Sequence, residues 1–244
     1  MHTLGPRMLL EIWERGVQAS NASRALLLMG AALPQVDPDA LLNASIGHRD
    51  AWLLSLRDAL FGSRVECLLP CPACGQQIEL DFRVGDIRAP HAPPGQLCEV
   101  GGAGPARRFR VPTSADLLAI ECERDPAAAE RRLLARLWEP AEGESRTLDA
   151  PAWLAELAGD VAQALREQDS QAEVLLQLSC PNCGGRAEET FDIAAHLWCE
   201  LDHWARAMLR KVHALASRYG WSEDFIVGMS PARRQAYLAL AGEA

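Results

Sequence analysis

The chain has 244 residues, enough to bury one large hydrophobic core or two small ones. A net charge of −9 argues against a general nucleic-acid binder, which needs a basic surface. The longest apolar run near the N-terminus, Ala25 to Leu33, is too short to span a bilayer, and the first residues do not resemble a secretion signal. We therefore expect a cytoplasmic protein that does not bind membranes.

The first 62 residues predict helices, because apolar residues recur at steps of three and four. The strongest of these patterns is Ile46 to Phe61, where Trp52, Leu53 and Leu56 mark a single apolar face that ends at Gly62. The other predicted helices are residues 6–17, a segment from Ser20 or Asn21 to Leu33, and a short turn that begins at Asp37 and Pro38.

Two five-residue segments that lie far apart share one pattern. They read Cys71-Pro72-Ala73-Cys74-Gly75 and Cys180-Pro181-Asn182-Cys183-Gly184, and we call them the first and the second knuckle. Each is a turn between two strand-like runs, so each predicts a β-hairpin with two thiols at its tip. The predicted strands are residues 64–70 and 77–84 around the first knuckle, and 171–178 and 185–191 around the second.

Each knuckle supplies half of a metal site. A structural zinc ion takes four ligands in a tetrahedron, and thiolates bind it well. We therefore expect one structural zinc per chain, held by Cys71, Cys74, Cys180 and Cys183. The two hairpins must then meet in space across the 105 residues that separate Cys74 from Cys180.

Other interpretations of the cysteines are weaker. A catalytic zinc needs an open coordination position, and four cysteines leave none, so we expect no enzymatic activity. A redox role would favour a strand-to-helix junction, whereas both knuckles lie between strands. The remaining cysteines are expected to be packing residues, although Cys67 is close enough to the first knuckle to replace a ligand; they are Cys67, Cys98, Cys122 and Cys199.

The middle and the end of the chain complete an α+β prediction: a mainly helical protein with a split zinc ribbon and a small inserted lobe. Residues 89–105 are expected to be a loop and 139–150 a polar linker. The other predicted elements are a strand at 107–111 and helices from Thr113 and at 125–137, 152–168, 192–219, 222–226 and 231–240. The predicted divisions are 1–84 (helices and first hairpin), 85–170 (inserted lobe) and 171–244 (second hairpin and C-terminal helices).

Several segments beside the knuckles resemble one family. They are Leu9–Gly16, Gly47–Asp50, Leu60–Gly62, Val111–Leu117, Phe191–Ile193, Leu197–Trp198, Tyr219–Glu223 and Arg233–Leu238. Together they resemble a T4-like bacteriophage baseplate protein family, whose members are encoded with contractile injection systems, the phage-tail-like particles of bacteria. The resemblance runs nearly from end to end.

This resemblance implies a non-enzymatic protein that binds wedge, hub or spike proteins of a baseplate, with no nucleic-acid, membrane or small-molecule partner. It would act in the assembled particle or in its assembly. Aromatic residues between Tyr219 and Leu240 are the expected contact element. The alternative is a zinc-ribbon module for nucleic acid or transcription, which the neutral-to-acidic segments Gln76–Glu79 and Ala187–Glu189 disfavour.

Overall fold

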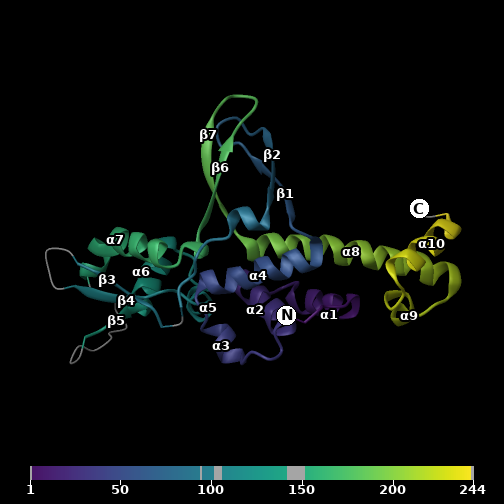
Figure 1. The fold of residues 1–244 in the computed structure, drawn as a ribbon, viewed down its shortest axis with the longest axis horizontal. Helices are drawn as coiled ribbons and strands as arrows, with labels where there is room; N and C mark the ends of the chain where they lie inside the picture. The colour runs from purple at the N-terminus through teal and green to yellow at the C-terminus, as the bar shows by residue number, and fades with distance from the viewer. Residues whose placement is uncertain (1, 94, 102–105, 142–151, 243–244) are drawn as a thin grey trace.

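The computed structural model describes residues 2–93, 95–101, 106–141 and 152–242, which form a mainly helical protein with small antiparallel sheets (Figure 1). The helices are α1 (Pro6–Gly16), α2 (Asn21–Ala32), α3 (Pro38–Leu42), α4 (Ile46–Phe61), α5 (Ser114–Ile120), α6 (Pro126–Leu137), α7 (Ala152–Gln168), α8 (Ile193–Tyr219), α9 (Glu223–Val227) and α10 (Pro231–Ala241). The strands are β1 (Arg64–Pro70), β2 (Gln77–Arg83), β3 (Leu97–Val100), β4 (Arg107–Arg110), β5 (Trp138–Glu139), β6 (Val174–Ser179) and β7 (Arg186–Phe191). Short 3-10 turns are η1 (Val84–Ile87) and η2 (Ser170–Ala172).

The helix ends follow the capping residues that the sequence offers. The side chain of Ser45 accepts a hydrogen bond from the backbone N–H of His48 at the start of α4, and Asp192 accepts one from Ala195 at the start of α8. These caps satisfy backbone donors that a helix leaves free at its first turn. Gly220 ends α8 in the left-handed conformation, directly after the predicted end of this helix at residue 219.

The main hydrophobic core lies between α1, α2, α4 and the first half of α8. Leu28, Leu53, Leu197 and Leu201 are fully buried there. The predicted face of α4 packs into this core, because Trp52, Leu53 and Leu56 all belong to it, but the buried side of the helix is not apolar throughout. Its charged residues Arg49, Asp50 and Arg57 are also buried, and they are held by the ion pairs Arg49–Asp50 and Arg57–Glu200.

The second half of α8 extends beyond this core and carries a smaller one with α9 and α10. Ala205, Leu215, Ile226 and Leu238 are buried there. Figure 1 shows this C-terminal unit at the far end of α8, away from the hairpins. None of the helices that the structure describes combines the length and apolar character needed to cross a bilayer.

The inserted segment has a core of its own. Strands β3, β4 and β5 form a sheet, and α6 and α7 pack with it around Phe109, Leu137, Leu154 and Val161. Two loop predictions are therefore wrong in part, because 97–100 is strand β3 and Glu139 belongs to β5. Positions 94, 102–105 and 142–150 of those two segments lie outside the described residues, and the other described positions in them have no helix or strand.

A buried polar joint connects the inserted segment to the helical body. The carboxylate of Asp169, which is 1% exposed, accepts hydrogen bonds from the backbone N–H groups of Gly47 (2.9 Å) and Ala92 (2.7 Å). The side chain of Gln171 accepts a third hydrogen bond from Ala89 N–H at 2.7 Å. One carboxylate thus ties the start of α4 to the chain that enters the inserted segment and to the chain that leaves it.

Candidate metal centre

The two predicted hairpins stand side by side on the helical body, with their knuckles at the far tips (Figure 1). In the first hairpin Pro70 pairs with Gln77 directly below the knuckle, and in the second Ser179 pairs with Arg186. The second hairpin therefore repeats the register of the first. Helix α4 leads directly into β1 and α8 follows directly after β7, so rigid elements position both halves of the site.

Each knuckle is closed by the same pair of backbone hydrogen bonds. In the first, Cys71 N–H donates to Gln76 C=O and Gly75 N–H donates to Cys71 C=O, both at 2.8 Å. The second repeats these bonds between Cys180 and Gly185 and between Gly184 and Cys180, both at 2.9 Å. Gly75 and Gly184 have φ of 72° and 69°, a conformation that side chains other than glycine rarely adopt, which explains the glycine after each second cysteine.

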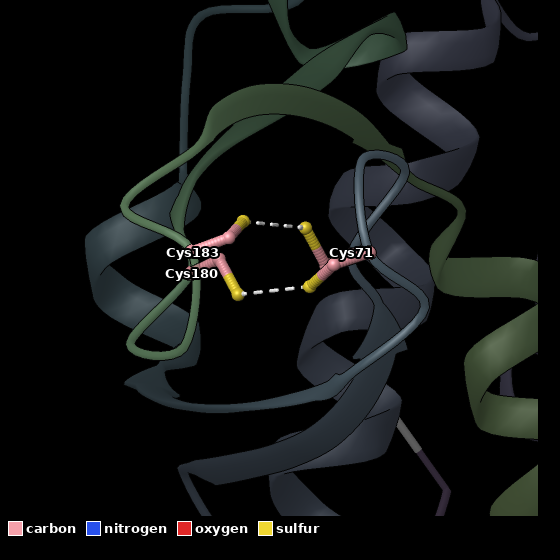
Figure 2. A group of neighbouring side chains, drawn as sticks. Cys71, Cys180 and Cys183 are labelled. Atoms are coloured by element: carbon pink, nitrogen blue, oxygen red, sulfur yellow. Dashed lines mark hydrogen bonds between the residues drawn. The ribbon is translucent and has the colours of Figure 1, made fainter.

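The four predicted ligands form one cluster. Their sulfur atoms all lie within 4.8 Å of one another. Cys71 Sγ is 3.8 Å from Cys183 Sγ, and Cys74 Sγ is 3.7 Å from Cys180 Sγ, so each close pair joins the two knuckles (Figure 2). A tetrahedral zinc with metal–sulfur bonds of about 2.3 Å separates its ligand atoms by about 3.8 Å. The four cysteines could hold a metal ion, and their spacing is compatible with a structural zinc.

A small hydrophobic layer supports the cluster from the side of the helical body. Ile78 of β2 and Leu178 of β6 are buried together with Cys71 and Cys180, and four half-buried residues surround them: Leu69, Leu80, Leu176 and Ala187. Cys74 and Cys183 are exposed. Each knuckle thus contributes one buried thiol from its start and one exposed thiol from its end.

The exposed thiols of Cys74 and Cys183 accept hydrogen bonds from nearby N–H groups. The backbone N–H of Gln76 and the side-chain amide of Asn182 lower the pKa of the Cys74 thiol to about 6. At Cys183 the backbone N–H of Gly185 also lowers the pKa, but the neighbouring thiols outweigh it and raise that pKa to about 11. Crowded thiols resist losing several protons together unless a cation offsets the charge, which is what a bound metal ion provides.

Asn182 is a site residue that the sequence analysis did not identify. Its amide Nδ2 lies 3.7 Å from Cys74 Sγ, so the second knuckle donates to a thiol of the first. Ala73, at the matching position of the first knuckle, cannot do the same. The sequence does carry a signal for this role: the position between the two cysteines is an asparagine in the second knuckle and an alanine in the first.

The remaining cysteines lie outside the cluster. Cys98 is buried in the core of the inserted segment, as expected for a packing residue. Cys122 and Cys199 are exposed, so the packing prediction is wrong for both. Cys67 is half-buried on β1 and does not belong to the group of four.

Comparison of the chain with protein-family models, with curated proteins and with solved structures finds no match. The function therefore has to be inferred from the residues and their arrangement.

Proposed function

We propose that this chain is a non-enzymatic structural or assembly protein of the baseplate of a contractile, phage-tail-like injection system, stabilised by one structural zinc. The observation that carries the zinc is the closed group of four cysteine sulfurs within 4.8 Å of one another. Four thiolates complete a tetrahedron and leave no position for water or substrate. The metal would therefore hold the two hairpins together and would not take part in a reaction.

The baseplate role rests on the family resemblance, and contacts between the resembling segments support it. Gly16 ends the segment Leu9–Gly16, and Trp198 ends Leu197–Trp198. A Cβ atom at position 16 would lie 2.2 Å from the Trp198 ring, so the glycine is required for α1 to pack against α8. Two residues in the segments that resemble the family, Gly16 and Trp198, thus determine how α1 packs against α8 in this chain.

The C-terminal unit offers the kind of surface that a baseplate partner could bind. Trp221 stacks on Tyr219 with ring centroids 4.5 Å apart and meets Tyr237 at 4.8 Å. Phe225 remains 46% exposed beside them, and the Arg233 guanidinium lies 5.6 Å from the centroid of its ring. Aromatic side chains and arginine are the residues that dominate binding energy in protein interfaces.

Charge on the hairpins favours a protein partner over nucleic acid. Glu79 and Glu188 are exposed on the two hairpins, and Glu66 and Asp81 add negative charge to the first. The two hairpins also carry exposed arginines, Arg64, Arg83 and Arg186, but these do not outnumber the carboxylates. A zinc ribbon that binds a phosphate backbone needs an excess of arginine or lysine on this surface.

Deletion of the gene tests the proposal. Because a contractile tail needs its baseplate as the template for polymerisation, the deletion strain should contain free sheath and tube proteins and few intact particles. Complementation with the wild-type gene should restore the particles, and complementation with a Phe225→Ser, Trp221→Ser double variant should restore fewer. Normal particle yield and contraction in the deletion strain would show that the proposed role is wrong.

A further inference from the structure

A second feature, separate from the metal centre, is a cleft of about 1060 Å³ between the first hairpin and α8. Its walls include Phe61 from α4, Leu68 and Leu69 from β1, Leu80 from β2, and His196 and Cys199 from α8. A volume of this size is typical of sites that bind ligands or peptide segments. Leu68 is 62% exposed, so the described residues leave this apolar wall uncovered.

The cleft follows the free edge of β1. Successive side chains of a strand point to opposite faces, and the cleft contacts four consecutive residues of β1, 66–69, and three of β2, 79–81. The cleft therefore reaches both faces of the hairpin, and β1 contributes the larger part of its wall. Strand β1 pairs only with β2 among the described residues. Apart from the carbonyl of Arg64, which accepts a hydrogen bond from Arg57, its other edge offers backbone groups for pairing. Such an edge can accept a further strand from another chain.

Charge around the cleft selects the partner. Four carboxylates line it, together with two histidines: Glu66, Glu79, Asp81, Glu200, His196 and His203. Arg64 pairs with Glu66 and Asp81, and Arg57 pairs with Glu200, so the carboxylates still outnumber the arginines around the cleft. A second copy of this chain, paired edge to edge, would bring carboxylates against carboxylates. A segment whose outward side chains are lysine or arginine would instead meet opposite charge.

We propose that the edge of β1 binds an extended segment of a partner protein, which adds as a third strand and alternates apolar with basic side chains. The apolar side chains would pack against Leu69 and Leu80 on one face of the hairpin, and the basic ones would face Glu66 and Glu79, which share the other face with Leu68. The proposed function enters this inference in one respect only: it says that the partner would be another protein of the baseplate. The binding surface itself is inferred from the residues of the cleft.

Fluorescence anisotropy with the zinc-loaded full chain tests the proposal. The probe is a labelled ten-residue peptide of alternating valine and lysine, and two control peptides replace lysine by glutamate or N-methylate the backbone on one edge. Leu68→Arg changes an exposed residue of the cleft. Leu175→Arg is the matched control, because Leu175 is 47% exposed on the second hairpin and does not line the cleft.

The lysine peptide should bind wild type and Leu175→Arg equally, and Leu68→Arg at least tenfold more weakly. The glutamate and N-methylated peptides should also lose at least tenfold in affinity. Absence of binding, equal binding of the glutamate peptide, or equal effects of the two arginine variants would overturn the proposal. Equal binding of the N-methylated peptide would overturn strand addition. None of these results depends on particle yield in the deletion strain, so a failure here is distinct from a failure of the baseplate role.

Discussion

The rings of Phe82 and Phe191 meet edge to face with their centroids 5.4 Å apart, and the two residues occupy the same place in the two hairpins. Phe191 follows Phe82 by 109 positions, and Cys180 follows Cys71 by the same 109. Ile193 follows Val84 by 109 as well, and both are buried in the main core where α8 and η1 begin. The equivalence thus extends from the thiols at the tips to the base of the hairpins.

Phe82 and Phe191 should be energetically coupled. Edge-to-face aromatic pairs contribute about 1 kcal/mol beyond the area that they bury. In a double-mutant cycle of Phe82→Leu and Phe191→Leu, measured by urea unfolding of the zinc-loaded protein, we expect a coupling free energy of about 1 kcal/mol. Strictly additive effects would mean that the two hairpins do not support each other at their base.

Loss of one cysteine ligand should release the metal and loosen the hairpins while the helices remain folded. Cys180→Ser should reduce bound zinc from about one ion per chain to nearly none, as measured by elemental analysis. Structural zinc contributes on the order of 10 kcal/mol to the folding of small zinc domains. Here we expect a smaller loss of stability, because the main core lies in the helices. Cys122→Ser, at an exposed cysteine outside the cluster, is the control and should retain zinc.

Two arginine–carboxylate pairs in this protein should differ widely in their effect on stability. Arg57 is buried and donates to Glu200 and to the backbone carbonyls of Gly62 and Arg64, so Arg57→Met should lower the free energy of unfolding by about 3–5 kcal/mol. Arg64 pairs with Asp81 at the surface, where solvent screens the interaction, so Arg64→Met should lower the free energy of unfolding far less than Arg57→Met.

The matched measurement is urea unfolding of both variants and of the double variant Arg57→Met, Glu200→Met. Removal of both partners should cost less than the sum of the two single changes, because neither charge is left without its partner. Equal effects of Arg57→Met and Arg64→Met would contradict the role assigned to burial.

Asp50 should make stability decline as the pH rises. Burial raises the pKa of its carboxyl to about 6, in spite of Arg49 at 2.7 Å, whereas the carboxyl titrates at its ordinary lower value in the unfolded chain. The folded state therefore holds a proton more tightly, and this contribution to stability is lost as the pH rises through 6.

The stability of wild type minus that of Asp50→Asn should fall by about 1 kcal/mol between roughly pH 5 and pH 7, because the asparagine does not titrate. Urea unfolding at saturating zinc measures the difference, and changes in metal affinity with pH cancel between the two proteins. A constant difference over this range would show that Asp50 is ionised throughout.

The sequence predicts those parts of the fold that local chemistry determines. The bounds of α4 and α7 agree with the prediction, and capping residues such as Ser45 and Asp192 set the starts of α4 and α8. The four cysteines were predicted as one group because only two copies of the knuckle complete a tetrahedron, and their sulfur atoms do lie together. The helix bounds and the cysteine group could thus be predicted because a few local residues determine each of them.

Features that depend on distant contacts were missed. Strand β3 has four residues in a segment rich in proline and glycine, and it exists because Cys98 and Val100 pack into the inserted core beside β4. The burial of Arg57 could not be predicted either. Its partner Glu200 is 143 positions away, and a charged residue on a helix is ordinarily exposed.

The long separation of the two knuckles in the sequence also determines when the candidate metal centre can form during synthesis of the chain. A ribosome that adds 5–20 residues per second needs roughly 5–20 s to make the 105 residues between Cys74 and Cys180. During that interval the first pair of thiols exists without the second, while α5, α6 and α7 are synthesised. Closure of the candidate metal centre therefore has to wait for the second knuckle, and α8, which completes the main core, is synthesised only after it.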